Sequence, residues 1–412
     1  MSSMPPPPPA FAAAGPGFAR RADANAPDPD LGVIETNDEA SGAKACCASR
    51  GYFDDPFVKH FARRVPKHPP LINRGYHARV ATVRAVLDAF LDATFDADRA
   101  ENHLGATAPA TSRPTSGARI AKARGKKRQI VSLGAGFDTS YFRLRARERV
   151  DDHERHLMFV EIDHPSVMRT KAAIVNATAA TRAACVGGEG VRRLVPPSSS
   201  VVDAFDDGGG YAMRGCDLRD TNSLDAALDS VVGLDPTAPT LFLAECCLAY
   251  LEAEQAEATL GWAARWGGAS SRSGDADDTN QSPTTHALRA YFAYDPTLTA
   301  DTSADAFGAQ MVLNLKARGC PLLGAESVLG VGAHASRARR NGWTRAGAAD
   351  MLAASARLAT EDAKEARRVA FLEPLDELEE YRLIQKHYVV SWGVRGGNES
   401  DAARLERVVD RK

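Results

Sequence analysis

The sequence predicts an α/β fold in which a mostly parallel β-sheet is flanked by helices. Short runs rich in Val, Ile, Leu and Phe recur along the chain, and longer segments with a helical spacing of apolar residues separate them. Several of these runs end in a glycine or an acidic residue, at the position where open parallel sheets bind ligands. The chain has 412 residues, 44% of them apolar, which is enough for one large core.

The first 40 residues differ in composition from the rest. Residues 1–40 are rich in Pro, Ala and Asp and cannot bury enough apolar surface to offset the entropy of ordering, so we expect a disordered leader. Residues 41–412 are expected to form a single domain, with a helical lid at 41–95 and a core at 129–412. Low-complexity surface insertions are expected at 98–128, 186–210 and 267–284.

The individual elements follow from apolar spacing and from capping residues. A helical segment at 54–94 precedes the first strand, and its part at 79–91 (RVATVRAVLDAFL) is strongly periodic. Strands are predicted at 129–133 (QIVSL), 157–162 (LMFVEI), 211–216, 240–244 (TLFLA) and 288–294, with a late pair around Trp343 and 387–394. Helices are expected to begin near Ser166, Ser223, Glu252 and Thr302, each with a cap or an acidic first turn.

Charge and cysteine content restrict the class of partner. Acidic and basic residues number 53 and 51, so the surface as a whole is not built to hold nucleic acid or anionic lipid. Seven cysteines without a CxxC spacing indicate a reducing compartment and no zinc site. The sequence has neither a membrane-spanning apolar run nor a hydrophobic signal core. We expect a cytoplasmic monomer without a metal, whose partner is a protein or a small molecule.

Residues 130–144, IVSLGAGFDTSYFRL, read as a buried strand that runs into a Gly-x-Gly turn and then a helix. Gly134 and Gly136 would let the backbone turn sharply and approach a ligand. The third glycine of a dinucleotide fingerprint is missing, and Asp138 and Thr139 occupy the helix start. Because an acid there would repel a pyrophosphate, the turn favours an amino-acid-like cofactor over NAD. Taken alone, it is equally compatible with a tight strand–helix turn.

Acidic residues follow three further strands. Asp163 ends the second strand, where a carboxylate can accept hydrogen bonds from ribose hydroxyls, or it caps the next helix. Asp217 follows the third strand and could accept from the exocyclic amine of adenine, or it is a surface turn residue. Glu245 ends the fourth strand, and a buried carboxylate there requires a cation nearby. Together with the glycine turn, these residues form an ordered set that is far more specific than any single member.

Eight sequence blocks occur in the order that is typical of one family. They lie at 51–61 (GYFDDPFVKHF), 69–80 (PPLINRGYHARV), 130–144, 159–171 (FVEIDHPSVMRTK), 215–220 (GCDLRD), 239–252 (PTLFLAECCLAYLE), 307–324 (FGAQMVLNLKARGCPLLG) and 387–399 (HYVVSWGVRGGNE). On these blocks the chain resembles the leucine carboxyl methyltransferases, which methylate the C-terminal leucine of the protein phosphatase 2A catalytic subunit. The resemblance covers most of residues 44–400. It implies a Rossmann-like class I methyltransferase sheet, mostly parallel with an antiparallel C-terminal strand, and S-adenosyl-L-methionine as cofactor.

The resemblance also implies the residues of the site. The implied cofactor contacts are Lys44, Arg79, Gly134, Asp163, Asp217, Leu218 and Glu245, to which the glycine turn adds Gly136. Arg79 and Lys44 would bring cations to the carboxylate of the cofactor or of the acceptor, and Arg50 is a possible substitute for Lys44. Tyr250 and Arg74 are hypothetical contacts to the acceptor, and both are also compatible with a structural role. A C-terminal carboxylate is already ionised at neutral pH, so no general base is expected.

Three other functions remain open. A tRNA-modifying enzyme that methylates a carboxylate on a hypermodified guanosine shares this domain but carries a long C-terminal repeat region, and no internal repeat is found here. The basic run at 122–128 is the best support for that function. A small-metabolite O-methyltransferase is disfavoured by the blocks at 69–80 and 387–399. A scaffold without catalysis is disfavoured because Asp163, Asp217 and Glu245 are all present.

Overall fold

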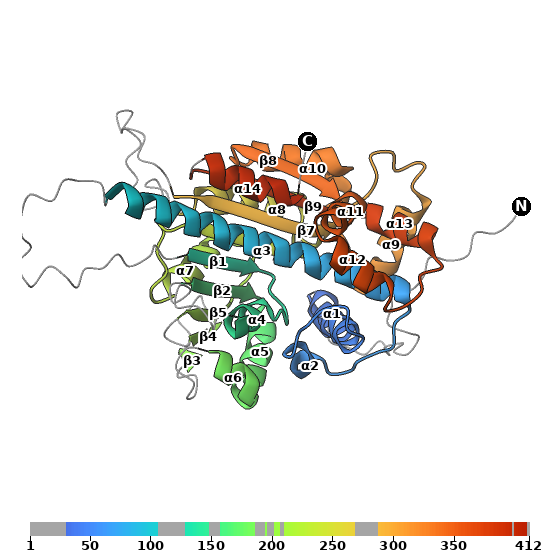
Figure 1. The fold of residues 1–412 in the computed structure, drawn as a ribbon, viewed down its shortest axis with the longest axis horizontal. Helices are drawn as coiled ribbons and strands as arrows, with labels where there is room; N and C mark the ends of the chain where they lie inside the picture. Colours follow the sequence, from blue (N-terminus) through green and yellow to red (C-terminus); the bar gives the residue numbers. More distant parts are fainter. Residues whose placement is uncertain are drawn as a thin grey trace, which may run out of the picture.

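The computed structural model describes residues 30–105, 128–147, 157–185, 194–195, 202–206, 210–267, 287–397 and 399–409. In this part of the chain, a nine-stranded sheet forms the centre and helices cover it (Figure 1). The strands are β1 (Arg128–Leu133), β2 (Leu157–Asp163), β3 (Leu194–Val195), β4 (Val202–Asp206), β5 (Tyr211–Gly215), β6 (Thr240–Glu245), β7 (Arg289–Pro296), β8 (Arg345–Asp350) and β9 (Tyr388–Arg395).

The helices precede, connect and follow these strands. They are α1 (Leu31–Ser49), α2 (Val58–Phe61), α3 (Pro70–Gly105), α4 (Ser140–Arg147), α5 (Pro165–Ala177), α6 (Ala179–Ala184), α7 (Thr221–Asp229), α8 (Ala253–Arg265), α9 (Ala306–Ala317), α10 (Val331–Arg340), α11 (Met351–Glu361), α12 (Ala363–Ala370), α13 (Leu378–Lys386) and α14 (Glu399–Val409). A short 3₁₀ helix, Leu248–Tyr250, follows β6. Within the described segments, none of the helices is long and apolar enough to cross a membrane.

The strand order is β3-β4-β5-β2-β1-β6-β7-β9-β8. The five strands β5, β2, β1, β6 and β7 run parallel to one another, and β9 is antiparallel to both β7 and β8. The predicted mostly parallel sheet with an antiparallel C-terminal strand is therefore confirmed. The chain moves outward from β1 through β2 to β5 and then returns to β6 on the other side, so the topological switch point lies between β1 and β6.

The register of the strands brings the predicted site residues together. Leu133 at the end of β1 pairs with Ile162 of β2 on one side and with Ala244 of β6 on the other. The residues that follow are Gly134, Asp163 and Glu245, which therefore meet at one edge of the sheet.

Side chains of the central strands alternate between two apolar clusters, because successive residues of a strand point to opposite faces. Ile130 packs into the cluster that contains α3, α5 and α14, and its neighbour Val131 packs into the cluster with α7, α8 and α10. The long helix α3 crosses one face of the sheet, α1 packs next to its first half, and α2 packs against α1 (Figure 1). Both faces of β1 are buried, as expected for a central strand of a parallel sheet that is covered by helices on both sides.

The predicted leader is too long. Helix α1 begins at Leu31, so the last ten residues of the predicted leader at 1–40 form its first half, and residues 1–29 lie outside the described part. The buried residues of α1 are small, Ser41, Gly42, Ala43, Ala45, Cys46 and Cys47. Such residues give almost no amphipathic pattern, because their apolar surface is small even where they pack tightly. The hydrophobic periodicity therefore failed to mark this helix.

Two predicted insertions are partly structured. Strands β3 and β4 lie within 186–210 and extend the sheet by an antiparallel hairpin next to β5. Helix α3 continues to Gly105, so it includes the first residues of the insertion predicted at 98–128, and β1 begins at Arg128. Residues 106–127 and 268–286 lie outside the described part. Helix α9 begins at Ala306 instead of near Thr302, since Asp305 provides its cap by accepting from the Gly308 amide.

Candidate active site

A cavity of about 400 Å³ lies at the carboxyl ends of the parallel strands. Its lining includes Gly134 after β1, Asp163 at the end of β2, Asp217 after β5 and Cys246 after β6. The first two turns of α1 form another wall, to which Asn37 belongs. A second cavity of about 40 Å³ shares Asn37 and Gly134 with the first, so the two adjoin at the switch point, where open α/β sheets bind ligands.

The turn after β1 can be formed only with glycine. Gly134 and Gly136 have φ angles of +66° and +50°, which lie in the left-handed region. A Cβ atom on Gly134 would lie 2.7 Å from Sγ of Cys247, and one on Gly136 would collide with the side-chain oxygen of Asn37. Gly134 lines both cavities and Gly136 lines the smaller one, so the turn lies at the candidate site.

Asp163 is fixed by the backbone on both sides. Its Oδ2 accepts from the Gly136 amide at 2.7 Å, and its Oδ1 accepts from the His164 amide at 2.6 Å. Burial raises the pKa of Asp163, and these two hydrogen bonds act in the opposite direction. Each oxygen keeps a second lone pair, which can accept from a ribose hydroxyl. The alternative role as a helix cap is wrong, because His164 is the capping residue of α5.

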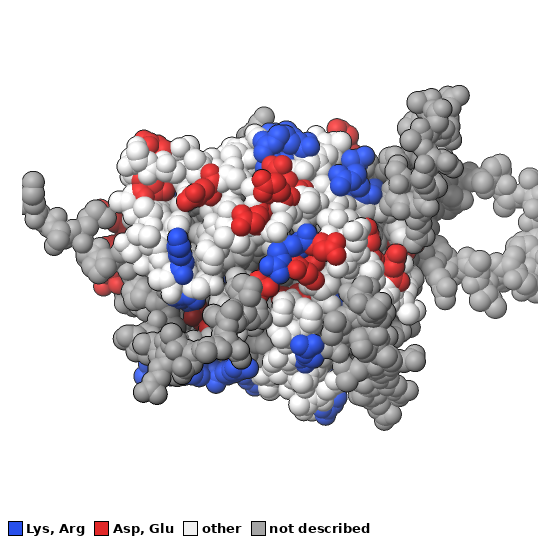
Figure 2. All heavy atoms as spheres, turned by 180° about the vertical axis from the view of Figure 1, so that it is seen from behind, with Lys and Arg blue, Asp and Glu red and all other residues white. Residues whose placement is uncertain are grey.

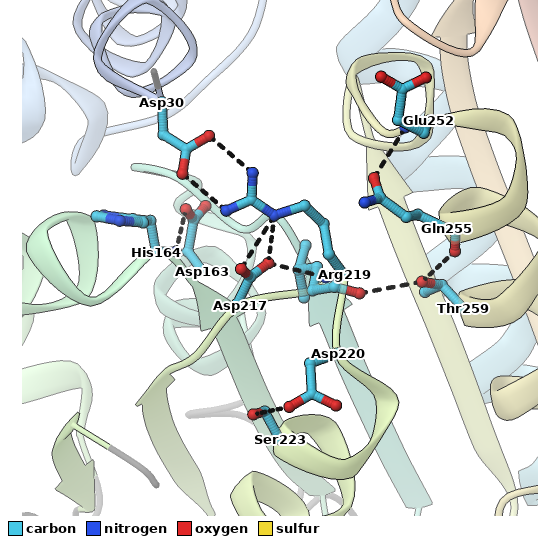
Figure 3. A network of polar contacts seen from close by, with 11 residues as sticks. Asp30, Asp163, His164, Asp217, Arg219, Asp220, Ser223, Glu252, Gln255 and Thr259 are labelled. Carbon is cyan, nitrogen blue, oxygen red and sulfur yellow. Dashed lines mark hydrogen bonds and ion pairs between the residues drawn. The ribbon is translucent and has the colours of Figure 1, made fainter. Parts of the chain in front are cut away.

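The loop after β5 contributes Asp217 and Leu218 to the lining of the larger cavity. The Thr259 hydroxyl on α8 donates to the carbonyl of Leu218 at 3.1 Å, which holds the backbone of the loop (Figure 3). The Asp217 carboxylate accepts from Arg219 through Nε at 2.8 and 3.0 Å. Asp217 therefore lies at the cavity with its carboxylate held by Arg219, and its expected contact with an exocyclic amine stays a prediction.

Two cations from different helices meet Glu245. Arg79 of α3 donates through Nε to Oε1 of Glu245, and Nζ of Lys44 on α1 lies 2.8 Å from the same oxygen. Lys44 also lies 3.6 Å from Asp138. Burial alone would raise the pKa of Glu245, but Arg79 and Lys44 lower it below the ordinary value. The cation that a buried Glu245 was expected to need is thus present twice. The Arg79 guanidinium also lies 5.1 Å from the ring centroid of Tyr294.

A strained turn after β6 places Tyr250 in the cavity lining. Among the described residues, Cys246 is the only one other than glycine with a left-handed backbone, at φ +54°. Asp295 of β7 holds this turn, since its Oδ1 accepts from the amides of Cys247 and Ala249 at 3.1 and 3.3 Å. The 3₁₀ helix that follows brings Tyr250 to the cavity. Burial raises the pKa of Tyr250, so its phenol stays a hydrogen-bond donor at neutral pH.

Two predicted cations lie elsewhere. Arg74 donates to the carbonyls of Ala370 and Glu373 and lines a separate cavity of about 940 Å³, which also includes residues of α11 and α12. Arg50 pairs with Glu373 at 2.6 Å on the same side of α3. The structure therefore brings Lys44 and not Arg50 to the site, and it does not bring Arg74 there.

Sequence reasoning missed the residues that α1 contributes near its start. Asp30, Ile34 and Asn37 line the larger cavity, and Asn37 also lines the smaller one. All three lie within residues 1–40, whose composition predicts a disordered leader, and such a leader has no predicted site role. One signal was available: the prolines that punctuate the preceding residues stop before position 31, and none follows until Pro56. A change in proline content of this kind marks the point where a helix becomes possible.

The donor set fits S-adenosylmethionine. Asp163 offers acceptors for ribose hydroxyls, Asp217 offers one for the adenine amine, and the glycine turn admits the ligand close to the backbone. Glu245 with Lys44 and Arg79 supplies both signs of charge, which the ammonium and carboxylate of an amino-acid tail require. A volume of about 400 Å³ lies within the usual range for sites of small ligands.

Known proteins align with most of the length of this chain. The protein-family model for leucine carboxyl methyltransferase matches residues 35–264. A leucine carboxyl methyltransferase 1 homolog from Arabidopsis thaliana is 31% identical over 88% of this chain and 89% of its own. Leucine carboxyl methyltransferase 1 from Rattus norvegicus is 28% identical over 90% and 92%. A tRNA wybutosine-synthesizing protein 4 from Homo sapiens is 33% identical over 88% of this chain but only 44% of its own.

A solved structure of a putative methyltransferase from Thermobifida fusca is 12% identical over 87% of this chain and 94% of its own, with a TM-score of 0.38, too low to support an inference about the site. The family match covers more than half of the chain, and it includes the glycine turn and all three strand-end acids. This protein belongs to the leucine carboxyl methyltransferase family, and its cofactor is S-adenosylmethionine.

Proposed function

We propose that this protein forms the methyl ester of the C-terminal leucine of the protein phosphatase 2A catalytic subunit. The observation that carries the proposal is the pair of cations at the switch point. Lys44 and Arg79 both contact the Glu245 carboxylate next to the cavity, and Lys44 also lies 3.6 Å from Asp138. Arg79 donates to Glu245 through Nε, so the Nη groups of its guanidinium can donate to a further carboxylate that enters the cavity. Relatives named leucine carboxyl methyltransferase 1 match this chain over about nine-tenths of their length, which supports the same acceptor.

The chemistry asks little of the protein beyond positioning. S-adenosylmethionine supplies an electrophilic methyl group when bound, and a C-terminal carboxylate with a pKa of about 3.5 is already a nucleophile at neutral pH. Arg79 and Lys44 attract that carboxylate, and Tyr250 can donate a hydrogen bond to it from the cavity wall. Holding the two reacting groups in line can contribute about 7–11 kcal/mol to lowering the barrier when the reactants are well oriented.

The thiols around the cavity do not compete for the methyl group. Cys216, Cys246 and Cys247 line it, and burial raises the pKa of all three thiols, to about 12 for Cys216 and Cys246. Since only the thiolate is a good nucleophile, the three side chains are inert at neutral pH. All seven cysteines of the chain are free, which supports a reducing compartment, and we propose that the enzyme acts in the cytoplasm as a monomer.

A tRNA acceptor is the second candidate, and one observation favours it. The human tRNA wybutosine-synthesizing protein 4 is 33% identical, although this chain spans less than half of that protein. The charge on one face of this molecule speaks against it. Figure 2 shows Lys and Arg interspersed with Asp and Glu among the described residues of that face, whereas nucleic-acid surfaces gather basic residues.

One assay separates the two acceptors. The enzyme would be incubated with methyl-labelled S-adenosylmethionine and either the phosphatase catalytic subunit, the same subunit without its last leucine, or tRNA that carries the wybutosine precursor. We expect label on the intact phosphatase alone, released by mild base as an ester is. Equal labelling of the shortened subunit, or labelling of tRNA only, would refute the proposed acceptor.

A further inference from the structure

A single guanidinium connects α1 to the loop after β5 (Figure 3). The Nη1 and Nη2 atoms of Arg219 donate to the two carboxylate oxygens of Asp30 at 3.0 and 2.8 Å. Its Nε donates to both oxygens of Asp217 at 2.8 and 3.0 Å. Asp30 is the residue directly before α1, so Arg219 joins the start of this helix to one of the acids implied to bind the cofactor.

These three residues lie at the larger cavity. Asp30, Asp217 and Arg219 all belong to its lining, together with Ile34 and Asn37 from the first turns of α1. The wall that α1 provides faces the loops after β2 and β5, where adenosine is expected. The position of the start of α1 therefore determines the width of the adenosine end.

The Asp217 side chain has no other fixed support among the described contacts. Thr259 holds the neighbouring carbonyl of Leu218, but this bond does not restrain the carboxylate of Asp217, which is 47% exposed. Arg219 supplies that restraint through its Nε and also through its own amide, which donates to Oδ1 at 2.9 Å. A planar guanidinium can hold two carboxylates in fixed directions, which a single ammonium cannot do.

We propose that Arg219 is a positioning residue for the cofactor, which orients Asp217 toward the adenine amine and holds the start of α1 over the same end of the cavity. The electrostatics agree with this role. Partial burial alone would raise the pKa of Asp217, and the hydrogen bonds from Arg219 lower it below the ordinary value. Asp217 consequently stays ionised as an acceptor, and Arg219 offsets the repulsion between Asp217 and Asp30.

The test measures cofactor affinity by calorimetry, with S-adenosylhomocysteine and no acceptor. Failure of this inference is thereby distinguishable from failure of the proposed acceptor. For Asp30→Asn we expect Kd to rise about fivefold, in line with a partly exposed ion pair of about 1 kcal/mol. For Arg219→Gln the rise is larger, because Asp217 is freed as well. In the double variant, Asp30→Asn adds nothing further, because its partner is already absent.

Two further variants sharpen the result. Arg219→Lys keeps the charge but not the planar fork, so we expect an affinity between those of the wild type and Arg219→Gln. The matched control is Asp38→Asn on the same helix, whose partner Arg63 lies 3.2 Å away and does not line the cavity, and its affinity is expected to be unchanged. Wild-type affinity in Asp30→Asn or in either Arg219 variant, or losses that simply add in the double variant, would overturn the proposal.

Discussion

Lys44 of α1 and Glu245 at the end of β6 form an ion pair with 2.8 Å between Nζ and Oε1, beside the contact of the same carboxylate with Arg79. The side chains of Lys44 and Glu245 are only 13% and 10% exposed, so little water screens this interaction. The pair joins the helix that precedes the whole sheet to the central strand next to the switch point. Lid and core are therefore parts of one site.

We predict that Lys44→Met weakens cofactor binding about tenfold or more, because a partly buried charged hydrogen bond contributes about 1.5–3 kcal/mol. Glu245 would keep only Arg79 and would lose the contact that connects it to α1. Titration calorimetry measures the change. Arg50→Met is the control, since Arg50 pairs with Glu373 away from the cavity and its loss should leave affinity unchanged. If Arg50→Met reduced cofactor affinity more than Lys44→Met, Arg50 and not Lys44 would be the cation of the site.

Asp163→Ala should reduce cofactor affinity strongly while the fold persists. The substitution removes the acceptors offered to ribose and frees the amides of Gly136 and His164. Asp220→Ala is the matched control on a neighbouring loop, because Asp220 caps α7 and is not part of the cavity lining. It should lower the melting temperature and leave affinity as it is. Equal cofactor affinity in the two variants would show that Asp163 does not bind the cofactor.

Gly136→Ala should impair both stability and cofactor binding, and a second substitution should partly restore them. The left-handed backbone at φ +50° costs a residue with a Cβ about 1–2 kcal/mol, and the new atom would collide with the side chain of Asn37. In Gly136→Ala with Asn37→Ala the collision is relieved and only the backbone cost remains. Chemical unfolding of both variants separates the backbone cost from the cost of the collision with Asn37. If the double variant were no more stable than Gly136→Ala, this explanation would be contradicted.

The contribution of one buried acid on β2 to the stability of the protein should fall as pH rises from about 5 to about 8. Glu161 on β2 is fully buried, and burial raises its pKa to about 7 although Lys171 lies 2.6 Å away and the Tyr211 hydroxyl donates at 2.7 Å. Unfolded chains lose this proton near pH 4.5, whereas the folded protein keeps it until near pH 7. The unfolded state therefore binds fewer protons in this interval, and folding becomes less favourable.

Glu161→Gln removes this titration, so its free energy of unfolding should change less with pH than that of the wild type. Urea unfolding between about pH 5 and pH 8 is the measurement, and the difference should be on the order of a few kcal/mol. Identical pH profiles for the two proteins would show that Glu161 is ionised throughout.

Removal of residues 1–40 should abolish tight cofactor binding, whereas removal of residues 1–29 should not. The longer deletion takes away Asp30, Ile34 and Asn37, which line the cavity, and leaves α1 without its first half. The shorter deletion keeps every described residue of the lining. The measurement is the cofactor affinity of the two truncated proteins. Tight binding after the longer deletion would mean that α1 does not form the cavity wall in solution.

Sequence alone identified the sheet and the acids at its edge. The local pattern around Gly134, Asp163 and Glu245 was sufficient, because a buried strand followed by a special residue defines a strand end wherever it occurs. The need of Glu245 for a cation was also predictable from the cost of burying a charge. Which residue supplies that cation could be predicted only from the resemblance to a family, because Lys44 lies far from Glu245 in sequence.

The parts that could not be predicted depend on contacts between distant segments. Arg219 reads as one charge in a DLRD turn, and nothing local indicates that it reaches Asp30. Arg74 and Arg79 stand on the same helix, yet only Arg79 faces Glu245, because five residues of an α-helix turn the side chain by about 140°. Helix α1 was missed because it packs through small residues, whose burial leaves no hydrophobic period.

The uneven burial of α1 has a consequence for turnover. Its second half, around Ser41 to Cys47, is packed against the rest of the protein, whereas the described residues before Ser41 are only partly covered. Fraying of those first turns would widen the cavity without disturbing a single strand. We therefore expect spent S-adenosylhomocysteine to leave through local unwinding of about ten residues, a process that hydrogen exchange at their amides would record as rapid opening in an otherwise slowly exchanging protein.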